Sequence, residues 1–250
     1  MEFELRVWRQ KGPEDKGGLK DYHVKDIQPD MSVLEMLDTL NQKLVESGED
    51  PIAFESDCRE GICGMCGLVI NGVPHGDQPG STTCELRMRH FKDGQTITIE
   101  PFRAKPFRVI KDLIVDRTSL DRIIQSGGFI SVRVGSEPEA NTHQVKKPDQ
   151  EEAMDAATCI GCGACAAACP NGSPMLFVSG KVAHLAKLPQ GQPEAARRVQ
   201  NMLATMFEEG FGNCSNHYEC QAVCPKDIDI KFIARLNREY IKSLAKNEQE

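Results

Sequence analysis

The eleven cysteines of this 250-residue sequence fall into three groups, and their spacing is the clearest chemical signal in the chain. The groups are Cys58, Cys63, Cys66 and Cys84, then Cys159, Cys162, Cys165 and Cys169, then Cys214, Cys220 and Cys224. The cytosol keeps thiols reduced, so a cysteine-rich cytosolic chain points to metal rather than to disulfides. An odd number of cysteines also fits poorly with a closed set of disulfide bonds. Metal-bound thiolates are therefore the favoured interpretation.

The first group has the spacing C-x4-C-x2-C with a fourth cysteine, Cys84, farther along, which is typical of a plant-type [2Fe–2S] cluster. Three thiolates must converge on one small cluster from a single loop. Gly61, Gly64 and Gly67 in that loop allow positive φ angles and a close approach of the backbone. A structural zinc site also takes four thiolates, but usually from separated pairs. We therefore expect [2Fe–2S] ligands at Cys58, Cys63, Cys66 and Cys84.

The second group has the spacing C-x2-C-x2-C-x3-C-P of a bacterial ferredoxin. In that pattern the fourth cysteine ligates the other cluster of the pair, so Cys169 is expected to leave its three neighbours. Cys224, which Pro225 follows, is expected to return and complete the first set. The predicted [4Fe–4S] ligands are Cys159, Cys162, Cys165 and Cys224.

The third group lacks one thiolate. When it is overlaid on the same pattern, the position of the second cysteine holds His217, so one iron corner has no thiolate. A cubane that lacks one iron is a [3Fe–4S] cluster, and the three predicted clusters then use every cysteine. Imidazole replaces thiolate in some iron–sulfur centres, so ligation of a fourth iron by His217 stays open as the alternative. The predicted [3Fe–4S] ligands are Cys169, Cys214 and Cys220.

Mixed secondary structure is expected to position the first group. Residues 3–7 and 96–100 alternate apolar and polar side chains, and residues 68–70 are apolar before an Asn-Gly turn, so all three segments are predicted strands. A helical stripe begins after Asp30 or Ser32, either of which is a suitable N-cap.

Helices are expected to position the other two groups. Apolar residues between 113 and 124 predict one or two short helices, and residues 193–209 and 230–244 predict amphipathic helices. The polar stretch 136–150 contains two prolines and predicts an exposed loop. We also expect residues 71–83 to form a surface turn before Cys84.

These elements predict an α+β fold in two domains. A plant-type ferredoxin (β-grasp) domain is expected over residues 1–105, and an all-α bacterial-type ferredoxin domain over residues 106–250. The boundary is placed near Pro101 and Pro106, inside the long stretch without cysteine.

The composition narrows the class of protein. The chain is 40% hydrophobic and 27% charged with a formal net charge of −7, and a nucleic-acid binder more often has a basic face, so nucleic acid is not an expected partner. The N-terminus lacks the features of a secretory signal, and no apolar run approaches the length of a membrane span. We expect a soluble protein on the cytoplasmic side, with any membrane attachment made through a partner.

With both cluster motifs in this order, the chain resembles the iron–sulfur subunits of succinate dehydrogenase and fumarate reductase. The likeness covers nearly the whole chain and includes residues 58–67, 106–123, 159–170 and 220–228. The connector VIKDLIVD and the histidine in the gap of the third motif make the resemblance more specific than ferredoxin motifs alone.

The resemblance implies an electron-transfer subunit with no catalytic residue of its own. A separate flavoprotein subunit with covalent FAD would interconvert succinate and fumarate. Electrons would pass from FAD to the [2Fe–2S], then the [4Fe–4S], then the [3Fe–4S] cluster. A cytochrome b membrane anchor with haem would connect the last cluster to quinone, so the chain would be peripheral on the cytoplasmic face of the inner membrane.

One departure from the family concerns the quinone. Many members have a tryptophan shortly after the proline that follows the cysteine, where it lines a quinone pocket. Here Asn171, Gly172, Ser173 and Pro174 follow Pro170, and the only tryptophan is Trp8. We therefore expect electrons to leave through haem in an anchor of the dihaem type.

Two other functions compete with this one. The chain could be the iron–sulfur part of another flavin-linked oxidoreductase without a quinone-reactive anchor, such as a thiol-linked fumarate reductase. A cysteine-rich zinc scaffold that assembles partners is the alternative from another class.

Overall fold

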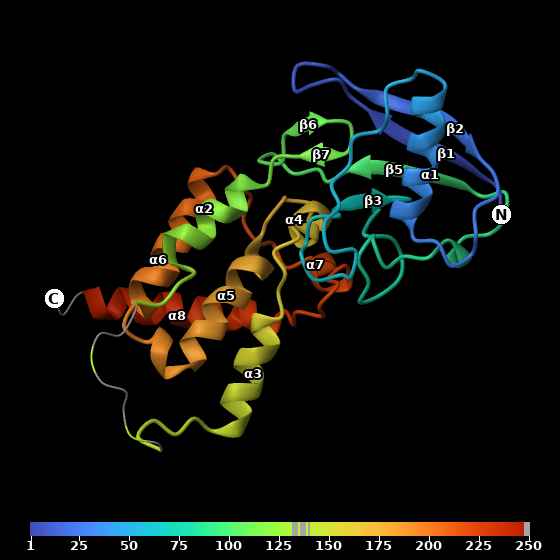
Figure 1. The fold of residues 1–250 in the computed structure, drawn as a ribbon. Coiled ribbons are helices and arrows are strands. Elements are labelled where there is room, and N and C mark those ends of the chain that lie inside the picture. The colour runs from blue at the N-terminus through green and yellow to red at the C-terminus, as the bar shows by residue number, and fades with distance from the viewer. Residues whose placement is uncertain (132–134, 136–138, 140, 248–250) are drawn as a thin grey trace.

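The computed structural model describes residues 1–131, 135, 139 and 141–247. A mixed β-sheet with one helix lies beside a set of helices, and the chain passes from the sheet to the helices once (Figure 1). The N-terminus lies in the sheet half, and the described chain ends at the far end of the helical half (Figure 1).

The sheet has five strands in the order β2-β1-β5-β3-β4. β1 (Phe3–Arg9) pairs antiparallel with β2 (Gly18–Val24) and parallel with β5 (Thr96–Pro101). β3 (Leu68–Ile70) pairs antiparallel with β5 and with the short β4 (Val73–Pro74). The three predicted strands are therefore confirmed as β1, β3 and β5, whereas β2 and β4 were not predicted.

Helix α1 (Val33–Glu46) covers the apolar face of this sheet. Its N-cap is Ser32, not Asp30, and the two halves of a capping box are present: Glu35 N donates to Ser32 Oγ at 3.2 Å, and Ser32 N donates to the Glu35 carboxylate at 2.6 Å. The apolar stripe of the helix is buried against alternate residues of β1, as the sequence periodicity predicts.

The helical half is built around α5 (Met175–Lys187), which packs against α3 (Lys147–Ala157), α6 (Ala195–Glu208) and α8 (Lys231–Asn247). α2 (Thr118–Gly127) packs on α6. The short elements are α4 (Ala164–Ala168), α7 (Glu219–Ala222) and the 3-10 turns η1 (Met88–His90) and η2 (Pro189–Gly191). The helices predicted over 193–209 and 230–244 are confirmed as α6 and α8.

The prediction that residues 106–250 are all helical is wrong at one place, because they include a short β-hairpin. β6 (Val109–Lys111) pairs antiparallel with β7 (Ile114–Val115), and a helix begins only at Thr118. Leu113, in the turn of this hairpin, packs into the core of the sheet half. Phe102 and Phe107 pack into the helical core instead. This connector therefore contributes to both cores, and the boundary at residue 105 stays a prediction.

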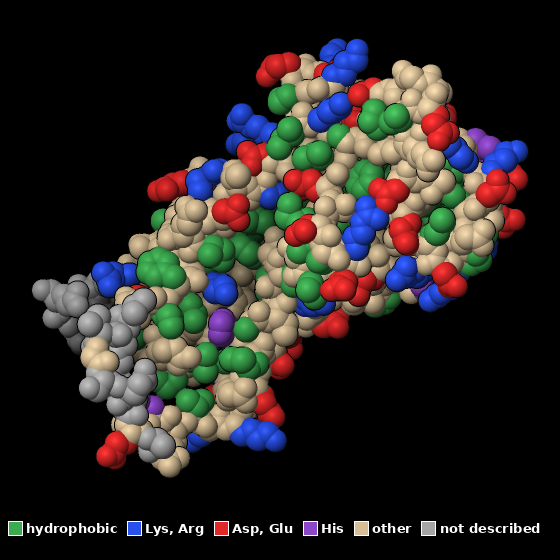
Figure 2. All heavy atoms as spheres, viewed as in Figure 1, with side chains coloured by type: hydrophobic (Ala, Val, Ile, Leu, Met, Phe, Trp, Pro, Cys, Tyr) green, Lys and Arg blue, Asp and Glu red, His purple; other side chains and the backbone are tan. Residues whose placement is uncertain are grey.

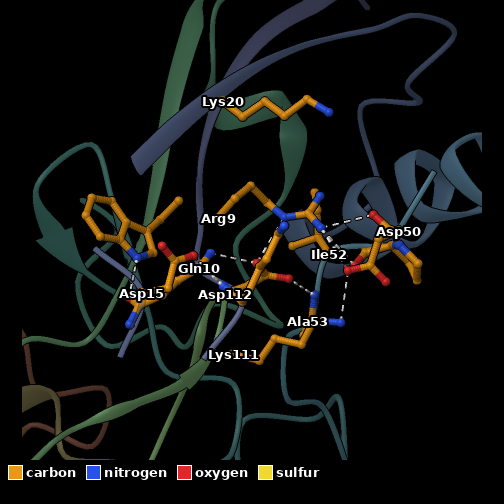
Figure 3. A network of polar contacts seen from close by, with 12 residues as sticks. Arg9, Gln10, Asp15, Lys20, Asp50, Ile52, Ala53, Lys111 and Asp112 are labelled. Atoms are coloured by element: carbon orange, nitrogen blue, oxygen red, sulfur yellow. Dashed lines mark hydrogen bonds and ion pairs between the residues drawn. The ribbon is translucent and has the colours of Figure 1, made fainter. Parts of the chain in front are cut away.

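Asp112 anchors the hairpin to the sheet half (Figure 3). Its buried carboxylate accepts hydrogen bonds from Gln10 N and Ala53 N, both at 2.9 Å, and from Arg9 Nε at 3.0 Å. Arg9 also donates to the carbonyl oxygen of Asp50 at 3.0 Å. The hairpin is thus tied to the end of β1 and to the segment that leads into the first cysteine loop.

The predicted loop over residues 136–150 ends earlier than expected. α3 begins at Lys147 with Pro148 in its first turn. Backbone N–H groups there have no partner within the helix, so proline costs no hydrogen bond. Residues 136–138 and 140 of that loop lie outside the described residues.

The surface of the molecule carries charges of both signs. On the face drawn in Figure 2, acidic and basic side chains are interspersed over the sheet half, whereas apolar side chains gather over the helices. Among the described residues no helix is long and apolar enough to cross a membrane.

Candidate iron–sulfur sites

The first group of cysteines lies at one end of the sheet half. The loop after α1 supplies three of them, and Cys84 comes from the segment that follows β4. Cys66 and Cys84 are 4% and 3% exposed and their thiols are hydrogen-bonded to each other. Cys58 lies nearer the surface, where its sulfur accepts a hydrogen bond from Glu60 N at 3.3 Å.

Hydrogen bonds favour the thiolate at two cysteines of this site, Cys84 and Cys58. The hydrogen bond from Cys66 lowers the pKa of Cys84 to about 6, and Thr82 and the backbone N–H of Gly61 act in the same direction. The same hydrogen bond, together with burial, raises the pKa of its donor Cys66. The Thr82 hydroxyl oxygen lies 3.1 Å from the sulfur of Cys84. Backbone N–H groups of Glu60 and Ile62 lower the pKa of Cys58. Because the thiolate is the form that binds metal, these donors favour cluster binding.

Two glycines of the first loop have positive φ angles that the packing requires. Gly61 has φ +68°, and a β carbon there would collide with the Glu85 carboxylate. Gly64 has φ +74°, and a β carbon there would lie 2.5 Å from the carbonyl oxygen of Ile160. Gly64 also lies against the backbone of Cys162. The first cysteine loop therefore abuts the second group directly.

The second site is a cavity lined by the four cysteines predicted to hold the [4Fe–4S] cluster, with apolar side chains around them. Its cysteines are Cys159, Cys162, Cys165 and Cys224, and its apolar lining includes Leu176, Phe177 and Ile228. The first three cysteines come from the segment around α4, whereas Cys224 comes from the turn after α7. The structure thus brings Cys224 to a group that precedes it by more than fifty residues in the sequence.

Burial favours the neutral thiol at three cysteines of the second site, Cys159, Cys162 and Cys165. Burial raises the pKa of Cys162 to about 12 and raises that of Cys165 well above its ordinary value. Backbone N–H groups of Ala164 and Gly161 act in the opposite direction on Cys162 and Cys159. Metal binding at this site must therefore release protons, as is general for thiolate ligands.

The third site is a separate cavity lined by Cys169, Cys214 and Cys220 together with His217. Cys169 therefore does not line the cavity of its own run, which is the exchange that the bacterial pattern predicts. Asn216 and Tyr218 flank His217 with φ angles of +59° and +72°, an uncommon conformation that shapes the loop around the cavity.

The turn after Cys169 is joined to the third motif. Asn171 Nδ2 donates to Ser215 Oγ at 2.8 Å and to the carbonyl oxygen of Asn213 at 3.2 Å. Gly212 packs so closely against Asn171 that a β carbon would not fit. These contacts hold the segments that carry Cys169 and Cys214 together.

The three sites fit iron–sulfur clusters by their chemistry. The second and third sites each gather cysteine sulfurs around one cavity, and the first site pairs Cys66 with Cys84 and Cys58 with Cys63. Backbone N–H groups that face sulfur are present at the first and second sites, and the second site is largely apolar. Within the described part of the chain, no three His, Cys, Asp or Glu side chains lie close enough to hold one metal ion.

His75 corrects the expectation that residues 71–83 are a surface turn. It is 1% exposed, Thr83 N donates to its Nδ1 at 3.3 Å, and its ring lies edge-to-face on Phe102 with centroids 5.4 Å apart. Burial lowers the pKa of His75 to about 4, so the imidazole is neutral. Thr82 and Thr83 are also buried. Residues 74–76 and 82–83 are thus buried, whereas residues 71, 72, 77, 79 and 80 of the same segment are exposed as expected.

Arg117 is a residue that the sequence analysis did not identify. Its Nη1 donates to the carbonyl oxygen of Gly64 at 2.6 Å and to that of Cys162 at 3.2 Å. Its Nη2 lies 3.0 Å from Met65 Sδ and 3.7 Å from the Glu55 carboxylate. One guanidinium thus bonds to the loops of the first and second sites, a contact that no local pattern in the sequence indicates.

Comparisons with known proteins match both halves. A model for the 2Fe-2S iron-sulfur cluster binding domain matches residues 4–122, and a model for the 4Fe-4S dicluster domain matches residues 140–228. The chain is 29% identical to succinate dehydrogenase [ubiquinone] iron-sulfur subunit 2 of Oryza sativa, over 91% of this chain and 70% of the relative. It is 26% identical to the fumarate reductase iron-sulfur subunit of Wolinella succinogenes, over 90% and 91%.

A solved structure has the same fold. A chain of the Mycobacterium smegmatis Sdh1 complex in the apo form superposes with a TM-score of 0.68 at 21% identity, covering 96% of each chain.

Proposed function

Because the chain belongs to the family of iron–sulfur subunits of succinate dehydrogenase and fumarate reductase, we propose that it relays electrons between a flavoprotein and a membrane anchor. The observation that carries this function is that seven of the eleven cysteines line two separate cavities in a chain with both domain types. Clusters at such sites accept and release one electron at a time, and this chain's residues supply the thiolates and tune them.

We propose the following ligands for the three clusters. A [2Fe–2S] cluster is held by Cys58, Cys63, Cys66 and Cys84, a [4Fe–4S] cluster by Cys159, Cys162, Cys165 and Cys224, and a [3Fe–4S] cluster by Cys169, Cys214 and Cys220. The two cavities with their separate cysteine sets support the second and third assignments. The contacts of Cys66 with Cys84 support the first.

The third cluster is proposed as [3Fe–4S] because His217 occupies the place of the missing cysteine. His217 lines the cavity with the three cysteines, so its position also suits the alternative in which imidazole ligates a fourth iron. The number of irons bound at this site distinguishes a [3Fe–4S] cluster from a cluster whose fourth iron is ligated by His217.

The sheet half is proposed as a β-grasp domain over residues 1–105. The strand order β2-β1-β5-β3-β4, with the one helix α1 between β2 and β3, supports this fold. The helical domain is then proposed over residues 106–250, with its hairpin docked on the first domain through Asp112.

We propose a flavoprotein subunit with FAD and a cytochrome b anchor as the partners, with the chain peripheral on the cytoplasmic face of the inner membrane. The segment Asn171–Pro174 after Pro170 has no tryptophan, which supports exit of electrons through haem in a dihaem-type anchor rather than through quinone bound beside the third site.

The function is tested by isolating the complex. An affinity-tagged chain, extracted from membranes in mild detergent, is expected to retain a flavoprotein and a two-haem anchor, and succinate should bleach its visible iron–sulfur absorbance. Retention of a flavoprotein without any haem-containing anchor would instead favour the other flavin-linked oxidoreductase. A colourless, zinc-containing preparation would favour the scaffold.

A further inference from the structure

The first and second sites meet at one backbone contact. A β carbon on Gly64 would lie 2.5 Å from the carbonyl oxygen of Ile160 and 3.2 Å from the backbone nitrogen of Cys162. The contact places the loop between Cys63 and Cys66 directly on the loop that carries Cys162. Between the proposed [2Fe–2S] and [4Fe–4S] ligands there is thus only a short stretch of backbone.

Arg117 holds this contact from one side. Its planar guanidinium donates from one nitrogen to both the carbonyl oxygen of Gly64 and that of Cys162, and its other terminal nitrogen reaches Met65. The side chain is 14% exposed, so the bonds are formed largely out of water. Hydrogen bonds to a charged donor are worth more in such a setting than neutral ones.

The backbone of Arg117 is itself fixed. Arg117 immediately precedes α2, and the Asp116 carboxylate accepts hydrogen bonds from Thr118 N at 2.9 Å and from Thr118 Oγ1 at 2.6 Å. Asp116 N donates to the carbonyl oxygen of Arg108 in turn. The guanidinium is therefore presented from a rigid helix start, not from a free loop.

The positive charge of Arg117 is also placed between the two sites. A groove runs past this point and contains Cys63 of the first loop and Gly161 of the second. Among the described residues that line it, Arg117 is the only basic one, and Glu55, which lies 3.7 Å from its Nη2, lines it together with Asp116 and Asp121. Because Nη1 of Arg117 donates to the carbonyl oxygens of both Gly64 and Cys162, its charge lies beside both loops.

We infer that Arg117 is a positioning residue for electron transfer, which locks the [2Fe–2S] loop to the [4Fe–4S] loop and places one positive charge between the two centres. The inference rests on the proposed function. It has two consequences: the distance between the centres is held constant, and both midpoint potentials are raised because a nearby positive charge favours the more negative, reduced state.

A purely structural role would look different. Arg198 also bonds to three carbonyl oxygens, those of Gly127, Phe129 and Gly191, and all three belong to the helical half. Loss of such a residue would lower the stability of the helical half without a specific effect on the first or the second centre. Arg117 instead joins two loops that carry proposed ligands of different clusters, so its loss should change the spectroscopy of both.

The test uses the complete complex with Arg117→Gln, Arg117→Lys and, as a matched control, Arg122→Gln. Arg122 lies in α2, where it pairs with Glu209 at the surface and donates to Thr118 Oγ1 at 2.9 Å, so its loss removes a nearby guanidinium and a contact at the helix start but no bond to either cysteine loop. Redox titration followed by low-temperature electron paramagnetic resonance (EPR) gives the two midpoint potentials and the spin–spin interaction between the two reduced centres.

In Arg117→Gln we expect both midpoint potentials to shift downward and the spin–spin interaction to weaken. Arg117→Lys keeps the positive charge but loses the planar guanidinium that bonds to both loops. Compared with Arg117→Gln, it should bring the midpoint potentials closer to the wild type than the spin–spin interaction. Arg122→Gln should match the wild type in both.

The inference is overturned if Arg117→Gln has wild-type potentials and spin–spin interaction. If Arg117→Gln fails to fold, Arg117→Lys decides: a wild-type spin–spin interaction in that variant overturns the inference. Absence of the three cluster signals from the wild-type complex would instead overturn the proposed function, so the two failures are distinguishable.

Discussion

Gly64 lies against the backbone of Cys162, with 3.2 Å between the place where its β carbon would stand and the Cys162 Cα atom. The two residues belong to the loops of different proposed clusters. Because Gly64 also has φ +74°, the loop cannot take another residue here without moving away from its neighbour. The approach of the first site to the second thus depends on a single missing side chain.

Gly64→Ala should therefore disturb both sites. The added methyl group meets the Ile160 carbonyl oxygen, and the positive φ angle costs about 1–2 kcal/mol in addition. We expect a lower iron content and a lower melting temperature. Gly48→Ala is the matched control, since Gly48 has φ +76° with nothing within 4 Å of its β-carbon position. Equal losses in the two variants would show that only the backbone strain matters, against this account.

Asp112→Asn tests the junction between the connector and the sheet half. The change leaves Arg9 without its buried counter-charge, and breaking a buried ion pair costs about 3 kcal/mol or more. For a chain of this size, that loss lowers the melting temperature by roughly 6–12 °C. Differential scanning calorimetry measures it. Asp21→Asn, which removes the exposed pair with Arg6, should have almost no effect. Similar melting temperatures for both variants would contradict the anchoring role.

His75 predicts a dependence of stability on pH. Its pKa is about 4 in the folded protein because of burial, and 6.5 is the ordinary value. Between these values the unfolded chain binds a proton that the folded chain does not, so stability falls as the pH drops from 6.5 to 4. The loss from this group reaches about 3 kcal/mol at the acid end.

The measurement compares melting temperatures at pH 7.5 and pH 5 in the wild type and in His75→Gln. The variant should lose less stability on acidification than the wild type. His90→Gln, at an exposed histidine, is the control and should behave as the wild type does. An unchanged pH dependence in His75→Gln would contradict the assignment of the effect to this imidazole.

The exchange of cysteines between the second and third sites can be tested one residue at a time. Cys169→Ser should abolish the [3Fe–4S] signal and preserve the [4Fe–4S] cluster, because Cys169 lines the third cavity. Cys224→Ser should do the reverse, because Cys224 lines the second. EPR before and after reduction reads both centres. Loss of the [4Fe–4S] cluster in Cys169→Ser alone would mean that each run serves its own cluster.

The sequence predicts the parts of this molecule that local spacing determines. Cysteine spacing set the groups that the second and third cavities bring together, including the crossing of Cys169 and Cys224. The N-cap candidates Asp30 and Ser32 and the amphipathic stripe after them are likewise local, and α1 begins after the second of the two. The helices α6 and α8 are long enough for the spacing of their apolar residues to identify a helix.

Features that depend on distant contacts were missed. The apolar run Leu113–Val115 is too short for its periodicity to separate strand from helix, and a bond network from Asp112 selects the hairpin. His75 lies in a polar, glycine-rich segment whose composition predicts exposure. Its ring nevertheless packs on the ring of Phe102, which directly follows β5. Arg117 directly follows the connector VIKDLIVD. Its hydrogen bonds, however, go to carbonyl oxygens about fifty residues before and after it in the sequence.

Iron and acid-labile sulfide analysis combined with EPR of the purified chain tests the central claim most directly. Three clusters of the proposed types require about nine irons per chain, a [3Fe–4S] signal in the oxidised protein and a [2Fe–2S] signal after reduction. About ten irons without the oxidised [3Fe–4S] signal would mean that a fourth iron fills the third site. Zinc in place of iron, or disulfide-bonded cysteines, would contradict the account as a whole.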